Sequence, residues 1–168
     1  MSLVLDTWVS SLLTDVYGDV PYFDANKGRE GILTPRFDKQ QAIYEDLFKK
    51  LEKANELFKT ATLTDDEAKL DPIYAGDLAK WRKFGNSLYL RLLLRVSGTA
   101  ELNAVSKIGE IVDTKKANYP IFTSNNDSAI LKFQTTAPYL SEFAEYRDID
   151  FHINNSLGEF FINNLNEW

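Results

Sequence analysis

The chain has 168 residues, with 19 basic and 25 acidic side chains, a formal net charge of −6, and 44% hydrophobic residues. This length and composition are typical of a globular protein with a substantial hydrophobic core. The acidic balance argues against nucleic acid as a partner, and the lack of cysteine excludes disulfides, thiolate zinc sites and thiol nucleophiles. One histidine cannot form the usual multi-histidine metal site, so we expect neither a metal nor a cofactor.

The first helix that the sequence predicts covers residues 3–16. Apolar side chains at positions 5, 8, 9, 12, 13 and 16 follow the spacing of one helix face, and Trp8 on this face is expected in the core. Gly18 can adopt a left-handed C-cap conformation, and Pro21 cannot continue a helix. The segment that follows, as far as residue 36, is therefore expected to be an ordered loop.

Three further helices are expected before residue 116. The second covers residues 38–59, with Asp38 as N-cap, Gln41 as its capping-box partner, and an Asp46–Lys50 pair on the solvent face. The third covers residues 78–96 after an Asp77 N-cap, and the fourth covers residues 101–114. Side chains expected to face the core include Tyr44, Trp81, Leu88, Leu92, Leu94, Val105, Ile108, Ile111 and Val112.

The last part of the chain, residues 117–168, is acidic and rich in asparagine and aromatic residues. It favours a short strand at residues 129–133 and helices at 140–146 and 157–168. Residues 125–127 favour a turn, with a ligand or calcium ion as the alternative. The expected fold is all-α: a tetratricopeptide-like stack of helical hairpins with irregular loops and at most one short strand pair. Residues 1–116 would form the scaffold, and residues 117–168 the start of an irregular region within the same structural domain.

Four motifs occur in a characteristic order. Residues 14–22 read TDVYGDVPY, residues 71–77 read DPIYAGD, residues 80–97 read KWRKFGNSLYLRLLLRVS, and residues 120–127 read PIFTSNND. Together they resemble the SusD/RagB-like family, the nutrient-binding outer-membrane lipoproteins of Bacteroidetes. Gly85 and Tyr89 depart from the family pattern, which has alanine and a basic or polar residue there. Because members are several hundred residues long and begin with a lipidated cysteine, the chain resembles a middle slice of such a protein.

The resemblance implies a function without chemistry. The parent protein would bind glycans at the cell surface and deliver oligosaccharides to a TonB-dependent outer-membrane transporter of the SusC-like kind. It would be held at the outer membrane only by a lipid anchor absent from this chain, since no stretch approaches the roughly 18–20 uncharged apolar residues of a membrane span. The family's binding residues lie in variable loops, so none is carried over to a position here.

Candidate glycan-binding residues come instead from the polar, asparagine-rich region. Sugar rings present apolar C–H faces that stack on flat aromatic rings, while amide and carboxyl groups bond the hydroxyls. The aromatic candidates are Tyr139, Phe143, Tyr146 and Trp168. The alternative is that these side chains form a minor core beneath loops.

A second set of residues is expected to hold the fold. It comprises Asp15, Tyr17, Gly18, Asp19, Pro21, Trp81, Asn86, Arg91 and Arg95. Arg91 and Arg95 lie one helical turn apart in an apolar run, where an unpaired buried charge would cost several kcal/mol. We therefore expect Asp15 or Asp19 to contact one of these arginines. The alternative is a charged cleft that grips a ligand.

Two other functions remain open. The chain would be a protein-interaction scaffold if the glycan site lay wholly in sequence outside it. It would be an all-α hydrolase if carboxylates such as Asp15 and Asp19, or the cluster at residues 65–67, lay about 5–10 Å apart across a sugar. The cluster falls in a polar connection where solvated acids are expected, and no catalytic residue is assigned.

Apolar helix faces that lack partners would favour self-association or lowered stability.

Overall fold

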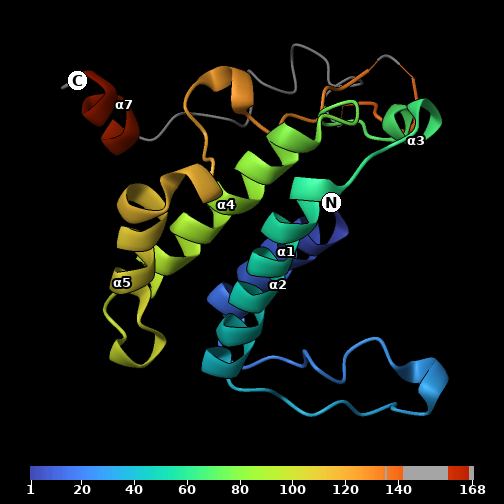
Figure 1. Ribbon diagram of the computed structural model, residues 1–168. Coiled ribbons are helices and arrows are strands. Elements are labelled where there is room, and N and C mark those ends of the chain that lie inside the picture. Colours follow the sequence, from blue (N-terminus) through green and yellow to red (C-terminus); the bar gives the residue numbers. More distant parts are fainter. Residues whose placement is uncertain (135, 142–158, 167–168) are drawn as a thin grey trace. The chain divides into compact units, whose positions relative to one another are not determined.

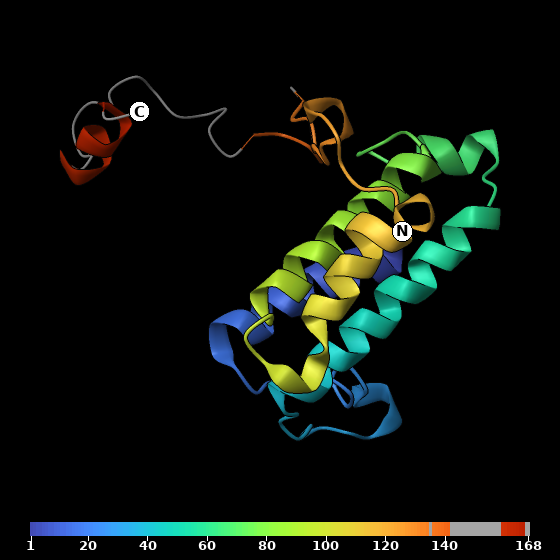
Figure 2. The ribbon, with the colours of Figure 1, turned by 60° about the vertical axis from the view of Figure 1, so that its left-hand side comes forward.

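The computed structural model describes residues 1–134, 136–141 and 159–166, and it divides into two compact units, Met1–Ile130 and Leu131–Trp168. The first unit contains the main helices α1 (Ser2–Tyr17), α2 (Gln40–Thr60), α4 (Leu78–Arg95) and α5 (Ala104–Gly109). Successive helices run in opposite directions, so the expected all-α stack of helical hairpins is confirmed (Figures 1 and 2). Within the described residues, every helix is too short or too polar to traverse a lipid bilayer.

Helices α2 and α4 supply most of the core. Ile43, Leu47 and Leu51 of α2 are fully enclosed, and they meet Trp81 and Leu92 of α4 in one apolar cluster. Burying a side chain of this size contributes about 1.5–3 kcal/mol. Asp77 begins α4 as expected, because its carboxylate accepts a hydrogen bond from the Lys80 amide at 3.0 Å. Leu94 was expected in the core but is exposed.

Helix α1 packs on α2 and α4 through a face that the sequence did not predict. The buried positions are Val4, Thr7, Ser11 and Thr14, here called the inner face of α1. The apolar positions Trp8, Val9, Leu12, Leu13 and Val16 are exposed instead and form its outer face. The prediction that Trp8 is a core residue is therefore wrong. Trp8 is 39% exposed, and its ring meets that of Phe84 edge-to-face, with ring centroids 6.5 Å apart.

Small inner-face side chains let the backbones of these helices come close together. A Cβ atom built on Gly85 of α4 would lie 3.1 Å from Cγ2 of Val4, which is tighter than ordinary van der Waals contact. Larger apolar residues on this side of α1 would push the helices apart, whereas on the outer face they meet no such limit. Close approach, rather than hydrophobicity, therefore decides which face of α1 is buried.

The segments between the main helices differ in detail from the expected ones. The polar connection before α4 contains a short helix, α3 (Asp65–Lys69), closed by a capping box between Thr64 and Glu67. The single helix expected at 101–114 is broken into η2 (Ala100–Leu102), α5 and the π-helix η3 (Glu110–Thr114). Asn103 has a positive φ of 47°, which interrupts the chain before α5. Ile111 is buried as expected, but Val105 and Val112 are exposed.

The connections of the first unit also contain three single 3-10 turns. They are η1 (Gly28–Glu30), η4 (Lys116–Asn118) and η5 (Asn125–Asp127), and the last confirms the turn expected at these positions. The long connection from α1 to α2 includes η1 and extends from one end of the helices (Figure 1).

The second unit contains helix α7 (Glu159–Asn166), which lies within the helix expected at 157–168. The strand expected at residues 129–133 is not formed, since these residues have no sheet partner in the described part of the chain. A single bridge joins Gln134 to Leu140 instead. The helix expected at 140–146 lies mostly outside the described residues. The expectation that residues 117–168 share one structural domain with the scaffold stays a prediction.

Candidate functional site

The turn after α1 is organised by backbone geometry and by one carboxylate. Gly18 ends the helix as expected, with a positive φ of 73° and an amide that donates to the Thr14 carbonyl at 2.8 Å, but its ψ of −119° is not that of the expected left-handed C-cap. Asp19 then reaches the start of α2, where its carboxylate accepts from the Gln40 amide at 3.0 Å and from Lys39 Nζ at 2.6 Å. These bonds hold the pKa of Asp19 below its usual range. Asp19 therefore stabilises a helix N-terminus and does not make the predicted contact with Arg91 or Arg95.

Asp38 does not have the role that the sequence predicted. It was expected to cap α2, but the N-cap position is Lys39, which makes no side-chain capping bond. The Asp38 carboxylate instead accepts from the amides of Tyr22 and Phe23, at 3.1 and 2.8 Å. The same segment is tied across the loop by the Asp38 amide, which donates to the Val20 carbonyl at 3.0 Å. Asp38 thus fixes the backbone on which two aromatic side chains stand.

The predicted contact between an aspartate and an arginine is confirmed for one pair. Arg95 Nε lies 2.7 Å from Asp15 Oδ2, and Tyr44 donates its hydroxyl to Asp15 Oδ1 at 2.5 Å. Burial, and then the neighbouring Asp15 carboxylate, raise the pKa of the Tyr44 hydroxyl. The Arg95 side chain is 54% exposed, so the pair is not the buried clamp that was expected, and solvent screens its contribution to stability.

The second arginine, Arg91, is exposed and forms no ion pair with any residue that the structure describes. Tyr17 is also exposed, whereas Pro21 lines a cleft beside the turn. Arg91 and Arg95 therefore do not form the predicted pair of buried arginines, because the side of α4 that carries them faces solvent.

The cleft beside the turn, here called the turn cleft, has a volume of about 350 Å³. Its charged groups come from α1 and α2, and the loop between these helices supplies its aromatic rings and one amide. The residues are Asp6, Tyr22, Phe23, Asn26, Asp46 and Lys50. This volume lies at the lower end of the range of small-molecule sites, about 300–1,000 Å³. An apolar ring beside several hydrogen-bonding groups is an arrangement that can hold a small polar ligand.

The polar groups of the turn cleft are linked to one another. Tyr22 donates its hydroxyl to Asp46 Oδ2 at 2.7 Å, and Lys50 Nζ lies 2.6 Å from Asp6 Oδ2 and 3.5 Å from Asp46 Oδ2. Burial, and then the Asp46 carboxylate set against Lys50, raise the pKa of Tyr22 to about 12. Burial tends to lower the pKa of Lys50, but its bonds to Asp6 and Tyr22 outweigh this and raise it. At neutral pH, Tyr22 is therefore neutral and Lys50 is charged.

Trp81, which the sequence assigned to the fold, belongs to a second carboxylate-centred cluster, here called the loop junction. Its indole Nε1 donates to Asp71 Oδ2 at 2.7 Å, and the same carboxylate accepts from the amides of Ile73, Tyr74 and Gly76. Tyr74 in turn donates its hydroxyl to the Asp127 carbonyl at 2.7 Å. The loop junction therefore ties the loop before α4 to the segment around η5.

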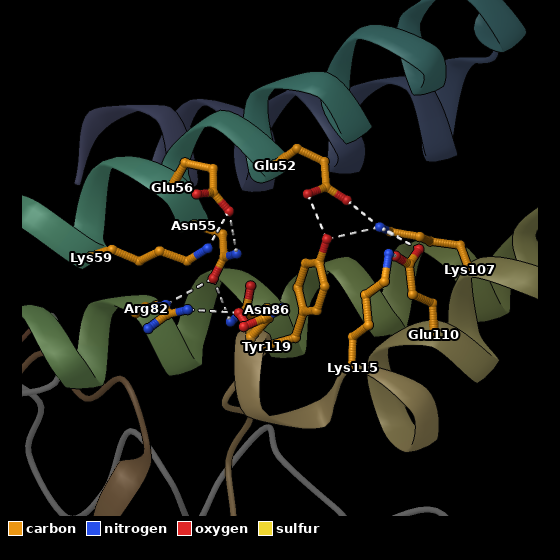
Figure 3. A network of polar contacts seen from close by, with 11 residues as sticks. Glu52, Asn55, Glu56, Lys59, Arg82, Asn86, Lys107, Glu110, Lys115 and Tyr119 are labelled. Atoms are coloured by element: carbon orange, nitrogen blue, oxygen red, sulfur yellow. Dashed lines mark hydrogen bonds and ion pairs between the residues drawn. The ribbon is translucent and has the colours of Figure 1, made fainter.

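Asn86 belongs to a network between α2, α4 and the segment around η4 (Figure 3). Its side-chain amide donates to Asn55 Oδ1 at 3.1 Å and to the Pro120 carbonyl at 2.9 Å, and Arg82 also donates to Asn55 Oδ1. Both asparagines are almost fully buried, so each bond replaces water that the core excludes.

Lys107 joins α5 to α2 beside this network. It lies 2.6 Å from Glu52 and 2.8 Å from Glu110, and it donates to the Tyr119 hydroxyl at 2.9 Å (Figure 3). Hydrogen bonds from Lys107 and Lys115 lower the pKa of Glu110 to about 2. These polar contacts, together with the buried Ala104 and Ile111, attach α5 and η3 to the stack.

Only one of the four predicted glycan-binding aromatics lies among the described residues. Tyr139 is half-buried in the second unit, and its carbonyl accepts from the Gln134 amide at 2.7 Å. Phe143, Tyr146 and Trp168 lie outside the described residues. Tyr22 and Phe23 were not among the predicted binding residues. Their position after Pro21 and the Asp46–Lys50 pair were the available signals, but only the fold brings the two together.

The carboxylates considered for hydrolysis are bonded within the fold or exposed to solvent: Asp15 and Asp19 bond to groups of α2 and α4. Asp65, Asp66 and Glu67 are exposed in α3, as expected for solvated acids, and Glu67 bonds to Thr64. Across the residues that the structure describes, no group of three or more acidic or histidine side chains is placed to hold a metal ion.

Comparison with known proteins gives a consistent result. A family model for SusD-like proteins, described as starch-binding associating with outer membrane, matches residues 1–168. Among solved structures, the chain is similar to a SusD-like protein from Bacteroides thetaiotaomicron, with 28% identity, a TM-score of 0.64 and coverage of 76% of this chain. It is also similar to a SusD homologue from Bacteroides uniformis, with 29% identity, a TM-score of 0.64 and coverage of 79%.

A third similar structure is described as a chitin-binding protein. It shares 35% identity with the chain, with a TM-score of 0.59 and coverage of 76% of this chain. The match covers 25% of that protein, 25% of the B. thetaiotaomicron protein and 26% of the B. uniformis protein, so the chain spans about a quarter of their length. None of the curated proteins matches the chain.

Proposed function

Because the chain belongs to the SusD-like family, described as starch-binding associating with outer membrane, we propose that its parent protein binds carbohydrate at the bacterial outer membrane. The observation that carries this proposal is the match of one family model to all 168 residues. The similarity to a chitin-binding protein at 35% identity supports the same class of ligand.

The proposed mechanism is capture without chemistry. Aromatic rings would orient the glycan through its apolar faces, and amide and carboxyl groups would select its hydroxyls. The parent protein would then pass oligosaccharides to a SusC-like TonB-dependent transporter in the outer membrane. A lipid anchor outside this chain would hold the parent protein at that membrane. Tyr139, Phe143, Tyr146 and Trp168 are the proposed aromatic contacts.

Calorimetry on the intact natural protein that contains this chain would test the proposal. Maltooligosaccharides and chitooligosaccharides are the two probes, because the family is described as starch-binding and one similar structure as chitin-binding. We expect saturable heat with at least one of them. A protein that is folded by circular dichroism and gives no heat with either series would overturn the proposal.

A matched pair of tyrosines would test the aromatic assignment. Tyr139→Ala should weaken binding roughly tenfold if its ring stacks on the glycan, because such contacts contribute about 0.5–1.5 kcal/mol beyond the buried area. Tyr17 is the control, since it is 72% exposed and lies in another part of the chain. Equal affinities for Tyr139→Ala, Tyr17→Ala and the wild type would remove Tyr139 from the proposed site.

A second function, that of a protein-interaction scaffold with its glycan site outside this chain, is supported by the outer face of α1. Its five apolar side chains, from Trp8 to Val16, lie on one helix and are 39% to 71% exposed. Exposed apolar stripes of this kind are typical of surfaces that another protein covers. Retention of a TonB-dependent transporter by the intact protein, together with unchanged glycan affinity after Tyr139→Ala, would favour this function. If the intact protein did not retain the transporter while the outer face of α1 was still exposed, this function would be contradicted.

A further inference from the structure

The turn cleft contains a preorganised aromatic ring. Phe23 is 41% exposed, and its ring packs edge-to-face on Tyr22, with centroids 5.0 Å apart and planes at 80°. Tyr22 is itself held by its hydroxyl bond to Asp46 and by Lys50, whose Nζ lies 4.7 Å from the ring centroid. The backbone amide of Phe23 is fixed by Asp38. The exposed ring of Phe23 is therefore positioned before any ligand arrives, which lowers the entropy cost of binding.

The carboxylates of the turn cleft retain unused acceptor atoms. Lys50 and Tyr22 bond to Oδ2 of Asp6 and of Asp46, and within the described residues no hydrogen bond occupies Oδ1 of either group. The Asp6 side chain is half-exposed and the Asp46 side chain is 31% exposed, so both are accessible to a ligand. Two carboxylates and one ammonium leave the cleft with one net negative charge. It therefore favours a ligand that donates hydrogen bonds and disfavours one that carries an acid group.

From this arrangement we propose that the turn cleft is a binding subsite for one sugar ring that is neutral or bears an amino group. The apolar face of the ring lies on Phe23, and its hydroxyl or ammonium groups donate to Asp6 and Asp46. Leu13 and Pro21 complete the apolar wall. The proposal rests on the carbohydrate-binding function above and adds to it a position in this chain and a charge preference.

The chain offers a matched control for the aromatic contact. Phe37 lies in the same connection between α1 and α2, is 72% exposed and does not line the cleft. In the intact protein, Phe23→Ala should weaken the affinity for a bound oligosaccharide roughly tenfold, while Phe37→Ala should leave it within about twofold. Calorimetry with chitooligosaccharides and maltooligosaccharides measures both, and circular dichroism compares the two variants' unfolding midpoints.

A second variant removes a polar group without disturbing the backbone. Asn26 has a φ of 62°, a conformation that glycine adopts freely, so Asn26→Gly deletes the side-chain amide and keeps the loop. The expected loss in affinity is about threefold, as for one neutral hydrogen bond. An unchanged affinity in both Phe23→Ala and Asn26→Gly, with the wild type binding normally, would overturn the subsite and leave the proposed function standing.

The charge preference has its own test. Deacetylated chitooligosaccharides, neutral chitooligosaccharides and glucuronate-containing oligosaccharides of equal length are compared on the wild type and on Asp6→Asn. We expect the wild type to bind the glucuronate series with the lowest affinity. In Asp6→Asn, the difference in affinity between the glucuronate series and the deacetylated series should be smaller. Preferential binding of glucuronate by the wild type would overturn the assigned class. If none of the three series binds, the subsite and the proposed function are overturned together.

Discussion

The loop junction and the turn cleft are built from the same kinds of groups. Each contains two carboxylates, one lysine and two aromatic side chains: the first uses Asp71 and Asp127, and the second uses Asp6 and Asp46. The two regions differ in how completely these groups are bonded within the protein. That difference, rather than the types of residue present, separates a structural cluster from a candidate binding site.

In the loop junction, every carboxylate oxygen has a partner. Asp71 is 8% exposed and accepts four hydrogen bonds, three of them from backbone amides and one from Trp81. Asp127 Oδ1 lies 2.9 Å from Lys83 Nζ, and its Oδ2 accepts from the amide and hydroxyl of Thr123. Each carboxylate oxygen of this cluster is thus engaged within the protein, and its groups define the path of two loops.

In the turn cleft, half of the carboxylate oxygens are unused within the described residues, and the lysine and aromatic rings border open space. The cleft is therefore expected to contribute little to stability and more to binding. The following variants test this contrast, from the largest expected effect on stability to the smallest.

The largest effect is expected for Asp71→Ala. The change removes the carboxylate that accepts hydrogen bonds from four donor groups, one of which is the buried Trp81 indole. Because a buried donor is then left without a partner, the free energy of unfolding should fall by about 3 kcal/mol. Urea unfolding followed by tryptophan fluorescence measures the loss. Asp66→Ala is the control, since the Asp66 side chain is 92% exposed and should change stability by about 0.5 kcal/mol or less. Equal stability of the two variants would contradict a structural role for Asp71.

The next largest effect is expected for Asp127→Asn, and it depends on pH. Bonds from Lys83 and then Thr123 hold the pKa of Asp127 well below its usual range. A lowered folded-state pKa stabilises the protein above the unfolded value of about 3.9, and this stabilisation is lost as the pH falls through the folded value. Between pH 7 and pH 2, the midpoint temperature of thermal unfolding should fall less in Asp127→Asn than in the wild type. Parallel curves for the two proteins would contradict the assignment.

A smaller effect is expected for Tyr22→Phe in the turn cleft. The ring and its contact with Phe23 remain, and only the hydroxyl bond to Asp46 is lost, so the expected cost is about 1 kcal/mol. Tyr17→Phe is the control because Tyr17 is exposed. The variant should also lose a tyrosine that ionises near pH 12 in ultraviolet titration. A loss as large as that of Asp71→Ala would place the cleft among the structural clusters.

The smallest effect on stability is expected for Phe23→Ala. Its ring is partly exposed and lies outside the main core cluster, so the free energy of unfolding should change by about 0.5 kcal/mol. This variant sharpens the contrast, because the same substitution is expected to weaken sugar binding. A large destabilisation, measured by urea unfolding, would mean that the cleft is part of the core.

Much of the helical fold could be predicted from local signals. Asp77 caps α4 and Gly18 ends α1 as expected, because capping depends on residues within one turn of the helix end. The apolar stripe of α1 correctly indicated a helix but not the buried face, since periodicity does not reveal how closely a neighbour approaches. The strand at 129–133 was wrong because a strand also needs a partner, which local residues do not specify.

The candidate site was harder to predict. The Asp15–Arg95 contact followed from the rule that charges near a core need partners, although Arg95 proved to be half-exposed. The turn cleft combines residues from position 6 to position 50, and the Asp46–Lys50 pair alone was consistent with an ordinary solvent-facing helix surface. Its proposed role as a binding site depends on which oxygens remain unbonded, and that is a property of the folded structure.

The inner face of α1 has a consequence for sequence change. Thr7, Ser11 and Thr14 are buried polar residues, and Val4 approaches the backbone of α4 at Gly85. The Thr7 hydroxyl has no hydrogen-bond partner among the described residues, so its exchange for a methyl group alters little at this contact, whereas one added methylene group would push the two helices apart. Divergent relatives should therefore keep side-chain size at this contact more strictly than polarity.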